Sequence, residues 1–291
     1  MQLCSLMRAQ EKIMKSDSKL FDLTGKVVIV TGAGGLLGQE HCKAIALSGG
    51  TPILLDISSS STEKLRNQLN ENYQCDSIAM KIDVTDENQV RNSCKEILKK
   101  YGKIDALVNN AANNPVIKDS QHSISFSRLE NFSLEMWNKD LAVTLTGSFL
   151  CSKHFGTAIS KNTNGGVIIN ISSDLGLIGP DQRLYSKPGL DSDQQPTKPV
   201  SYSVSKSGLI GLTRYIATYW ADQNVRSNAI CPGGIENNQS VDFINDISSR
   251  IPLNRMAKSD EYQSTLVYML SDSSSYLNGA IVSVDGGRTS W

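Results

Sequence analysis

Tyr202 and Lys206 stand four positions apart in the stretch PVSYSVSKSGLIGLTRYIA, residues 199–217. On a helix this spacing puts a phenol and an ammonium group on one face. A free phenol titrates at about pH 10 and is a poor base at neutral pH, whereas a neighbouring cation stabilises the phenolate. A fall of roughly two to three in the pKa of Tyr202 would bring it into the range of acid–base catalysis. The same spacing also occurs on ordinary surface helices, so its meaning depends on the rest of the chain.

A glycine-rich turn, TGAGGLLG, spans residues 31–38 between an apolar, β-branched run and a helical pattern. Glycine in such a turn lets the backbone approach a pyrophosphate, whose charge the helix N-terminus favours. Asp56 ends the second apolar run, 18 residues after Gly38, where a carboxylate can accept hydrogen bonds from ribose hydroxyls. That carboxylate would also repel a 2′-phosphate, and no arginine or lysine follows it directly. We therefore expect NAD(H) as the cofactor, with NADP(H) as the alternative.

Strand and helix patterns alternate from residue 21 to the end of the chain. Short β-branched apolar runs predict strands buried on both faces, and helical periodicity fills the segments between them. This alternation predicts an α/β fold in which helices cover both faces of a parallel sheet. No linker interrupts it, so residues 21–291 are expected to form one domain. The expected strands fall at 27–30, 51–57, 77–84, 104–112, 165–173, 225–234 and 280–287, and the expected helices at 35–50, 62–71, 86–102, 133–160, 200–222, 240–249 and 259–271.

Two polar loops interrupt this order at residues 113–131 and 180–199, and the second holds four prolines. Both follow the carboxyl ends of expected strands, where open α/β sheets bind ligands. Long loops without regular structure are usually either functional or disordered. We weigh two hypotheses equally for the second loop. It folds over a substrate, with Arg183, Tyr185 and Lys187 as contacts, or it is a surface insertion remote from the chemistry.

The composition argues against several other kinds of protein. Basic and acidic residues number 29 each, so neither a nucleic acid nor a membrane is expected as a partner. The six cysteines and three histidines are scattered without metal-ligand spacing, so no metal site is expected. Reduced thiols favour a cytoplasmic location. Residues 1–20 lack the apolar core of a signal peptide and are expected to be a flexible extension.

Seven short motifs follow one another in a characteristic order: TGAGGLLG, DV at 83–84, NNAA at 109–112, NISS at 170–173, YSVSK at 202–206, NAICPGG at 228–234 and VDGG at 284–287. With them the chain resembles the short-chain dehydrogenase/reductase family, in its single-domain branch, over residues 24–287. The details LLG and PGGIENN are similar to a subset from bacterial surface-sugar and flagellin-modification pathways. The resemblance implies a doubly wound, mostly parallel, seven-stranded Rossmann sheet and a nicotinamide cofactor.

The resemblance also implies roles for the residues at matching positions. Ser173 would hold the substrate oxygen, Tyr202 would exchange the hydroxyl proton, and Lys206 would also hydrogen-bond the nicotinamide ribose. Thr144 stands where the family has an asparagine that holds a water for proton relay, and its hydroxyl can hold one too. The implied cofactor-binding residues are Gly32, Gly35, Leu37, Gly38, Asp56, Asp83, Val84, Asn109, Ala111, Tyr202, Lys206, Pro232, Gly233, Ile235 and Asn237, with Asn109 at the ribose and Asn237 at the carboxamide.

The chain departs from the family pattern at two further points. Leu36 stands in the turn where the family usually has glycine, and Gly34 and Gly35 are expected to supply the flexibility instead. From Ser173 to Tyr202 there are 29 residues, about twice the family's usual spacing, and the excess is the proline-rich loop.

Three functions follow from these observations. The first is an NAD(H)-dependent oxidoreductase that interconverts a secondary alcohol and a ketone on a polar sugar or sugar-nucleotide-like substrate. The second is an NADP(H)-dependent enzyme of the 3-oxoacyl-[acyl-carrier-protein] reductase type, against which Asp56 speaks. The third is a catalytically weak regulator that binds a dinucleotide, against which the intact Ser173, Tyr202 and Lys206 speak. By analogy with the family, a homodimer or homotetramer is expected.

Overall fold

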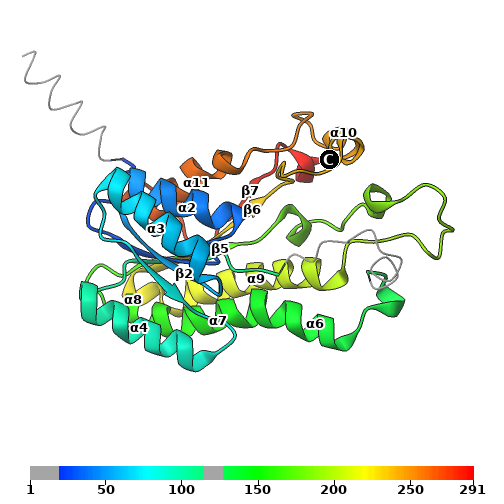
Figure 1. Ribbon diagram of the computed structural model, residues 1–291. Helices are drawn as coiled ribbons and strands as arrows, with labels where there is room; N and C mark the ends of the chain where they lie inside the picture. The colour runs from blue at the N-terminus through cyan, green and yellow to red at the C-terminus, as the bar shows by residue number, and fades with distance from the viewer. Residues whose placement is uncertain (1–19, 114–126) are drawn as a thin grey trace, which may run out of the picture.

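A computed structural model describes residues 20–113 and 127–291 (Figure 1). The extension expected at residues 1–20, except its last residue, and most of the loop expected at 113–131 lie outside the described residues. All seven expected strands and the principal helices fall within them.

The strands form one seven-stranded parallel sheet in the order β3-β2-β1-β4-β5-β6-β7. The order reverses between β1 and β4, which is the doubly wound topology with its ligand crevice at the carboxyl ends of the strands. The predicted fold class is therefore confirmed. The strands are β1 (Val27–Thr31), β2 (Thr51–Asp56), β3 (Ile78–Lys81), β4 (Ala106–Asn109), β5 (Gly166–Ile171), β6 (Val225–Pro232) and β7 (Ile281–Val284).

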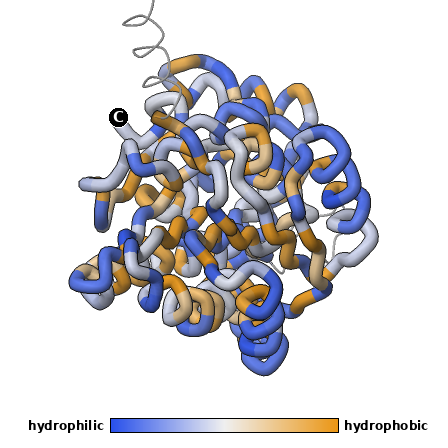
Figure 2. The backbone as a smooth tube through the Cα atoms, turned by 90° about the vertical axis from the view of Figure 1, so that its left-hand side faces the viewer, coloured by the Kyte–Doolittle hydropathy of each residue, from blue (hydrophilic) through white to orange (hydrophobic). Residues whose placement is uncertain are grey.

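Helices cover both faces of the sheet, because successive strand side chains point to opposite faces and both sets are apolar. Val28 and Val30 of β1 belong to the core on one face, and Val27 and Ile29 to the core on the other. Figure 2 shows the apolar segments gathered in the interior. One face carries α2 (Leu36–Leu47), α3 (Ser59–Tyr73) and α11 (Gln263–Leu270). The other carries α4 (Glu87–Tyr101), α6 (Leu134–Leu141), α7 (Gly147–Cys151), α8 (Thr157–Ile159) and α9 (Val200–Tyr219).

The segment expected as one helix over 133–160 is helical throughout but not uniform. Two π-helical turns, η2 (Ala142–Thr146) and η3 (Ser152–Gly156), separate α6, α7 and α8. Such π turns are rare and are frequent at functional sites. Asp86 caps helix α4, which begins at Glu87, because its carboxylate accepts hydrogen bonds from two backbone amides.

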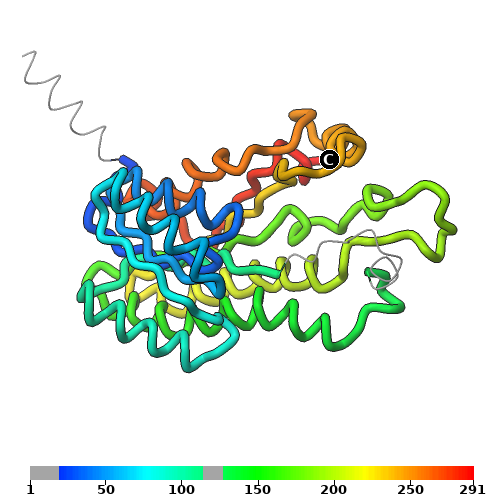
Figure 3. Tube along the Cα trace, viewed as in Figure 1, coloured from blue at the N-terminus to red at the C-terminus, as the bar shows by residue number. Residues whose placement is uncertain are grey.

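The proline-rich loop, residues 180–199, packs onto helix α10 (Val241–Ser248) through a short 3₁₀ helix, η5 (Gln182–Tyr185). Leu184 is buried in a small apolar cluster with Ile247 of α10, and the rings of Tyr185 and Phe243 lie 6.2 Å apart. The trace shows this loop (yellow-green) running beside the start of α9, beyond the carboxyl edge of the sheet (Figure 3). The loop therefore connects α10 with the start of α9, the helix that carries Tyr202 and Lys206.

Candidate functional site

The glycine turn closes tightly between β1 and α2. Gly32 has a φ of +61°, and the Gly35 amide donates to the Gly32 carbonyl at 3.1 Å. A Cβ at Gly32 would lie 2.8 Å from the Cα of Ala111, and one at Gly38 would lie 2.1 Å from the Gly32 carbonyl oxygen. Leu36 is simply the first residue of α2 and needs no special backbone angle. The departure at Leu36 thus leaves the turn intact.

A cavity of about 590 Å³ opens over this turn and the ends of β2, β3 and β4. Its size fits the adenosine and pyrophosphate of a dinucleotide. The close backbone approach at Gly32, which leaves no room for a side chain there, fits the pyrophosphate as well. Gly38 does not line the cavity but holds α2 against the turn. The expected residues that line it are Gly32, Gly35, Leu37, Asp56, Asp83, Val84 and Ala111.

Asp56 lies at the end of β2 with its carboxylate already fixed. One oxygen accepts a hydrogen bond from the Gly34 amide at 2.9 Å, and the other accepts from the Ser58 amide at 2.8 Å. Each carboxylate oxygen can accept more than one bond, so capacity for two hydroxyl donors remains. The two amide bonds hold the negative charge at the cavity wall, where it was expected.

Asn109 is placed differently from the expectation that it meets the ribose. Its side chain is 1% exposed and does not line the cavity. The amide instead donates to Ser152 at 3.1 Å and to Asn170 at 2.9 Å, between β4, η3 and β5. Strand alternation explains this, because Asn109 is the last residue of β4 and the next residue, Asn110, turns into the cavity. Asn110 donates to the carbonyls of Thr31 and Gly32 and so ties β4 to the glycine turn.

Ser173, Tyr202 and Lys206 come together at the carboxyl end of β5. Ser173 follows the strand, and its side chain lowers the pKa of Tyr202, which lies in the first turn of α9. Lys206, one turn further on, donates from Nζ to the Ile171 carbonyl at 2.7 Å. Its Nζ lies 5.8 Å from the centre of the Tyr202 ring. The structure therefore brings together the three residues that sequence reasoning assigned to acid–base chemistry.

The direction of the Tyr202 pKa corrects the sequence-based expectation. Burial raises the pKa of Tyr202 above its ordinary value, the hydrogen bond with Ser173 lowers it, and the nearby carboxylate of Asp174 raises it further. The expected fall is therefore wrong for the chain by itself, because burial and the Asp174 carboxylate together outweigh the lowering by Ser173. Burial likewise lowers the pKa of Lys206 to about 8.

Three charged residues at this site escaped the sequence analysis. Asp174 accepts a hydrogen bond from the Ser173 hydroxyl at 2.8 Å and forms an ion pair with Arg288. Lys198, from the end of the proline-rich loop, places its Nζ 3.9 Å from the centre of the Tyr202 ring. Asp174 and Arg288 directly follow the NISS and VDGG motifs, so a charge beside a motif could have pointed to them. Lys198 lies outside these motifs, two residues before α9, and had no such signal.

Thr144 lies in the π turn η2 and is 1% exposed. Its carbonyl accepts from the Ser148 hydroxyl at 2.6 Å, but its own hydroxyl has no hydrogen-bond partner among the described residues. A buried hydroxyl without a partner is costly, and such groups are usually satisfied by an ordered water.

The residues expected beside the nicotinamide follow β6. Pro232 is buried at the strand end, and the Gly233 amide donates to the Val284 carbonyl at 3.0 Å. Ile235 pairs with Ala257 in an isolated bridge, and Asn237 is exposed. This segment therefore lies at the same edge of the sheet as Ser173, because β6 is the direct neighbour of β5.

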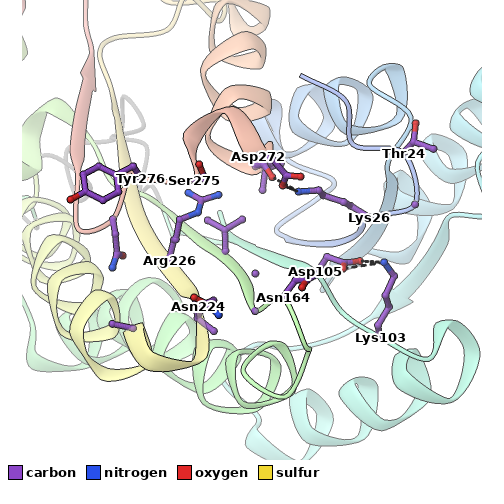
Figure 4. Close-up of a pocket in the computed structure, with 18 residues that line it drawn as sticks. Thr24, Lys26, Lys103, Asp105, Asn164, Asn224, Arg226, Asp272, Ser275 and Tyr276 are labelled. Atoms are coloured by element: carbon purple, nitrogen blue, oxygen red, sulfur yellow. Dashed lines mark hydrogen bonds and ion pairs between the residues drawn. The ribbon is translucent and has the colours of Figure 1, made fainter. Parts of the chain in front are cut away.

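A larger cavity, of about 1050 Å³, lies elsewhere, at the amino-terminal edge of the sheet (Figure 4). Four of its charged side chains form two ion pairs, with Lys26 2.6 Å from Asp272 and Lys103 3.0 Å from Asp105. It contains none of the expected site residues. Size alone therefore does not identify the functional site.

Within residues 20–113 and 127–291, no helix is long and apolar enough to cross a membrane. In the same part of the chain, no group of three or more histidine, cysteine, aspartate or glutamate side chains is arranged to hold a metal ion.

Comparison with known proteins agrees with this geometry. A family model described as short chain dehydrogenase matches residues 26–187, and one described as Enoyl-(Acyl carrier protein) reductase matches residues 190–289. The boundary between the two matches falls inside the proline-rich loop.

Several curated proteins are similar over nearly their whole length. A 3-oxoacyl-[acyl-carrier-protein] reductase of Thermotoga maritima is 31% identical, with 91% of this chain and 98% of the relative covered. An NADP-dependent mannitol dehydrogenase of Alternaria alternata is 32% identical over 92% and 94%. A post-translational flagellin modification protein A of Campylobacter coli is 29% identical over 91% and 98%. The relatives include both NADP-dependent and NAD-dependent enzymes.

Solved structures give the same result. A short-chain type dehydrogenase/reductase from Mycobacterium marinum superposes with a TM-score of 0.79 at 26% identity, covering 93% of this chain and 97% of that one. With the matched motifs and the sheet order, these findings show that the chain belongs to the short-chain dehydrogenase/reductase family and is an NAD(P)-linked oxidoreductase acting on CH–OH groups.

Proposed function

We propose that this chain is an NAD(H)-dependent oxidoreductase that interconverts a secondary alcohol and a ketone on a polar, sugar-like or sugar-nucleotide-like substrate. One observation carries the reaction. Ser173, Tyr202 and Lys206 meet at the sheet edge that also holds the glycine turn and Asp56. A hydride acceptor bound along that edge would reach the same place as a substrate oxygen held by Ser173 and Tyr202.

Each side chain has a distinct part in this proposal. A bound nicotinamide supplies or accepts the hydride. Ser173 and Tyr202 hydrogen-bond the substrate oxygen, and Tyr202 takes the hydroxyl proton on oxidation and returns it on reduction. Lys206, 4% exposed, supplies a positive charge that stabilises the phenolate and a donor for the ribose. Thr144 would hold a water that carries the proton onward, because its hydroxyl has no partner among the described residues.

The role of Tyr202 is tested by the substitution Tyr202→Phe, which removes one oxygen and keeps the ring. Turnover should fall by about 10²–10⁴-fold, the usual contribution of general acid–base catalysis. NADH affinity, measured by fluorescence titration, should change little. Retained turnover would remove Tyr202 from the mechanism, whereas loss of both properties would indicate a structural role.

The cofactor preference rests on Asp56. Its carboxylate is held at the cavity wall by two backbone amides, so it cannot easily withdraw from a 2′-phosphate. NADH and NADPH affinities should be compared for the wild type and for Asp56→Asn, with Glu63→Gln on the outer surface of α3 as the control for lost charge. We expect tight NADH binding, weak NADPH binding, and discrimination lost only in Asp56→Asn. A preference of the wild type for NADPH would overturn this part.

The substrate class is supported by the polar character of the proline-rich loop and by the kinds of relative found. The mannitol dehydrogenase, named for a sugar alcohol, favours a hydroxyl-rich substrate. The 3-oxoacyl-[acyl-carrier-protein] reductase, a relative of similar identity, supports a 3-oxoacyl thioester as the alternative substrate. Turnover of sugar alcohols, keto sugars and sugar nucleotides should be compared with that of a 3-oxoacyl thioester. Turnover of the thioester alone would replace the first proposal by the second.

We also propose a homodimer or homotetramer. Tyr215 and Tyr219 on α9 stack at 5.5 Å and are 62% and 58% exposed, and Phe149 on α7 is half exposed. Exposed aromatic residues on adjacent helices are typical of protein interfaces. Sedimentation of the wild type and of Tyr215→Ser tests this, since a wild-type monomer would contradict it.

A further inference from the structure

Lys198 is brought to the acid–base site by the proline-rich loop rather than by the sheet. It is followed by Pro199, the residue just before α9, and it precedes Tyr202 by four positions. Its Nζ lies 3.9 Å from the centre of the Tyr202 ring, closer than the 5.8 Å of Lys206. A cation within about 6 Å of a ring centre is attracted by the ring, and more strongly where water is excluded.

The loop fixes the position of this lysine. The Lys198 amide donates to the Gln182 side chain at 2.8 Å, which ties it to the 3₁₀ helix η5. Its neighbour Thr197 donates from its amide to Ser127 Oγ at 2.9 Å and from its hydroxyl to the Ser127 carbonyl at 2.8 Å. These backbone contacts hold the stem of Lys198 independently of its charge, so the charge can be removed without removing the anchor.

The charged and titratable groups found near Tyr202 come from several elements. Lys206 faces it from α9 itself, and Asp174 from the turn after β5, paired with Arg288 from the C-terminal segment. Tyr185 of η5 interacts with it electrostatically. Asp174 and burial oppose the phenolate. In their protonated forms Lys198 and Lys206 would favour it. Burial lowers the pKa of each lysine to about 8, and the charge of Lys198 contributes to the lowering at Lys206.

We propose that Lys198 is a positioning residue that stabilises the phenolate of Tyr202, so that the acidity of the catalytic tyrosine depends on the proline-rich loop. Ionisation of the phenol adds negative charge to the ring that the ammonium already faces, so the cation stabilises the charged form more than the neutral form. Lys206, also bound to the Ile171 carbonyl, supplies the second cation. The importance of Lys198 for catalysis rests on the proposed function, whereas its effect on the ionisation of Tyr202 does not.

The test is a titration of Tyr202 itself. The ultraviolet absorbance of tyrosinate is recorded immediately after pH jumps. The contribution of Tyr202 is the absorbance of the wild type minus that of the Tyr202→Phe variant. Lys198→Met, paired with its own Tyr202→Phe double variant, should raise the pKa of Tyr202 by about one or more. Lys198→Arg keeps the cation and should stay near the wild type. Lys161→Met, the same change at an exposed position beyond α8, should have no effect.

A second test is the pH profile of kcat/KM. Its ascending limb should move to higher pH in Lys198→Met and should lie near its wild-type position in Lys198→Arg. If Lys198→Met does not fold, Lys198→Gln supplies the uncharged variant with a polar end. An unchanged pKa of Tyr202 in the uncharged variant overturns the proposal, even if activity falls. A raised pKa supports it even if no sugar-like substrate is turned over, so failure of the proposed function is distinguishable from failure of this inference.

Discussion

The carboxylate of Asp174 and the guanidinium of Arg288 form a buried ion pair, with 2.8 Å between Oδ2 and Nη1 and side chains 4% and 8% exposed. The pair joins the segment after β5 to the segment after β7, across β6. The other oxygen of Asp174 accepts from Ser173 and from the Leu175 amide, each at 2.8 Å. The pair therefore holds Ser173 in place from the C-terminal end of the chain.

Removing one member of this pair should destabilise the protein strongly. Arg288→Met leaves the Asp174 carboxylate buried without its countercharge, and such single removals cost about 3–5 kcal/mol. The free energy of unfolding at neutral pH, measured in urea, checks this. The double variant Asp174→Asn/Arg288→Met removes both charges and should recover most of the loss. A single variant within about 1 kcal/mol of the wild type would show that the pair is not dry.

Gly38→Ala should disturb the turn and weaken NADH binding. The new Cβ would lie 2.1 Å from the Gly32 carbonyl oxygen and 2.8 Å from the Ala33 Cα, so backbone must move. We expect a loss of about 1–3 kcal/mol of stability and at least a tenfold weaker NADH affinity by fluorescence titration.

Gly211→Ala on α9 is the matched control, because nothing lies within 4 Å of its added Cβ. Replacing a helical glycine by alanine should stabilise the protein by up to about 1 kcal/mol. Equal effects of the two substitutions would contradict the close approach at the turn.

The fold could be predicted from the sequence because its signals are local and repeated. The central strands are short apolar runs, and such runs are typical of parallel strands buried on both faces. The trio of Ser173, Tyr202 and Lys206 could be predicted because each lies within a short motif. The direction of the Tyr202 pKa could not, since it depends on burial and on Ser173 and Asp174, which only the fold brings against the phenol.

Asn109 shows a second limit of the sequence. It and Asn110 are identical in type and adjacent, so composition cannot say which one faces the cavity. The end of β4 decides, because the strand pleat buries Asn109 and the following turn exposes Asn110.

The attachment of the proline-rich loop to α10 should depend on Arg250 and not on Arg183. Both guanidinium groups lie 2.8 Å from Asp181 Oδ2, but the Arg250 side chain is 28% exposed and that of Arg183 is 82% exposed. Exposed pairs contribute little, whereas partly buried ones contribute more. Arg250→Met should speed chymotrypsin cleavage after Leu184 or Tyr185, and Arg183→Met should not. Equal cleavage of both variants and the wild type would show that the apolar cluster alone holds the loop.

His41 gives the protein a specific sensitivity to acid. It lies on α2, is 1% exposed, and neither ring nitrogen has a hydrogen-bond partner among the described residues. Burial lowers the pKa of His41 from 6.5 to about 4, so the unfolded chain binds a proton between these values while the folded chain does not. Stability from this residue is therefore complete above pH 6.5 and is lost as the pH falls to about 4, by about 3 kcal/mol.

His41→Leu should remove this loss, because leucine fills the same apolar site without a titrating group. Urea unfolding of wild type and variant should be compared at neutral pH and at pH values down to about 4. The comparison cancels the carboxylates, which titrate equally in both proteins. The variant should be as stable as the wild type or more so at neutral pH, since a buried imidazole without partners is itself costly. Its advantage should then grow as the pH falls, whereas a constant difference would mean that His41 is already protonated or solvated in the folded chain.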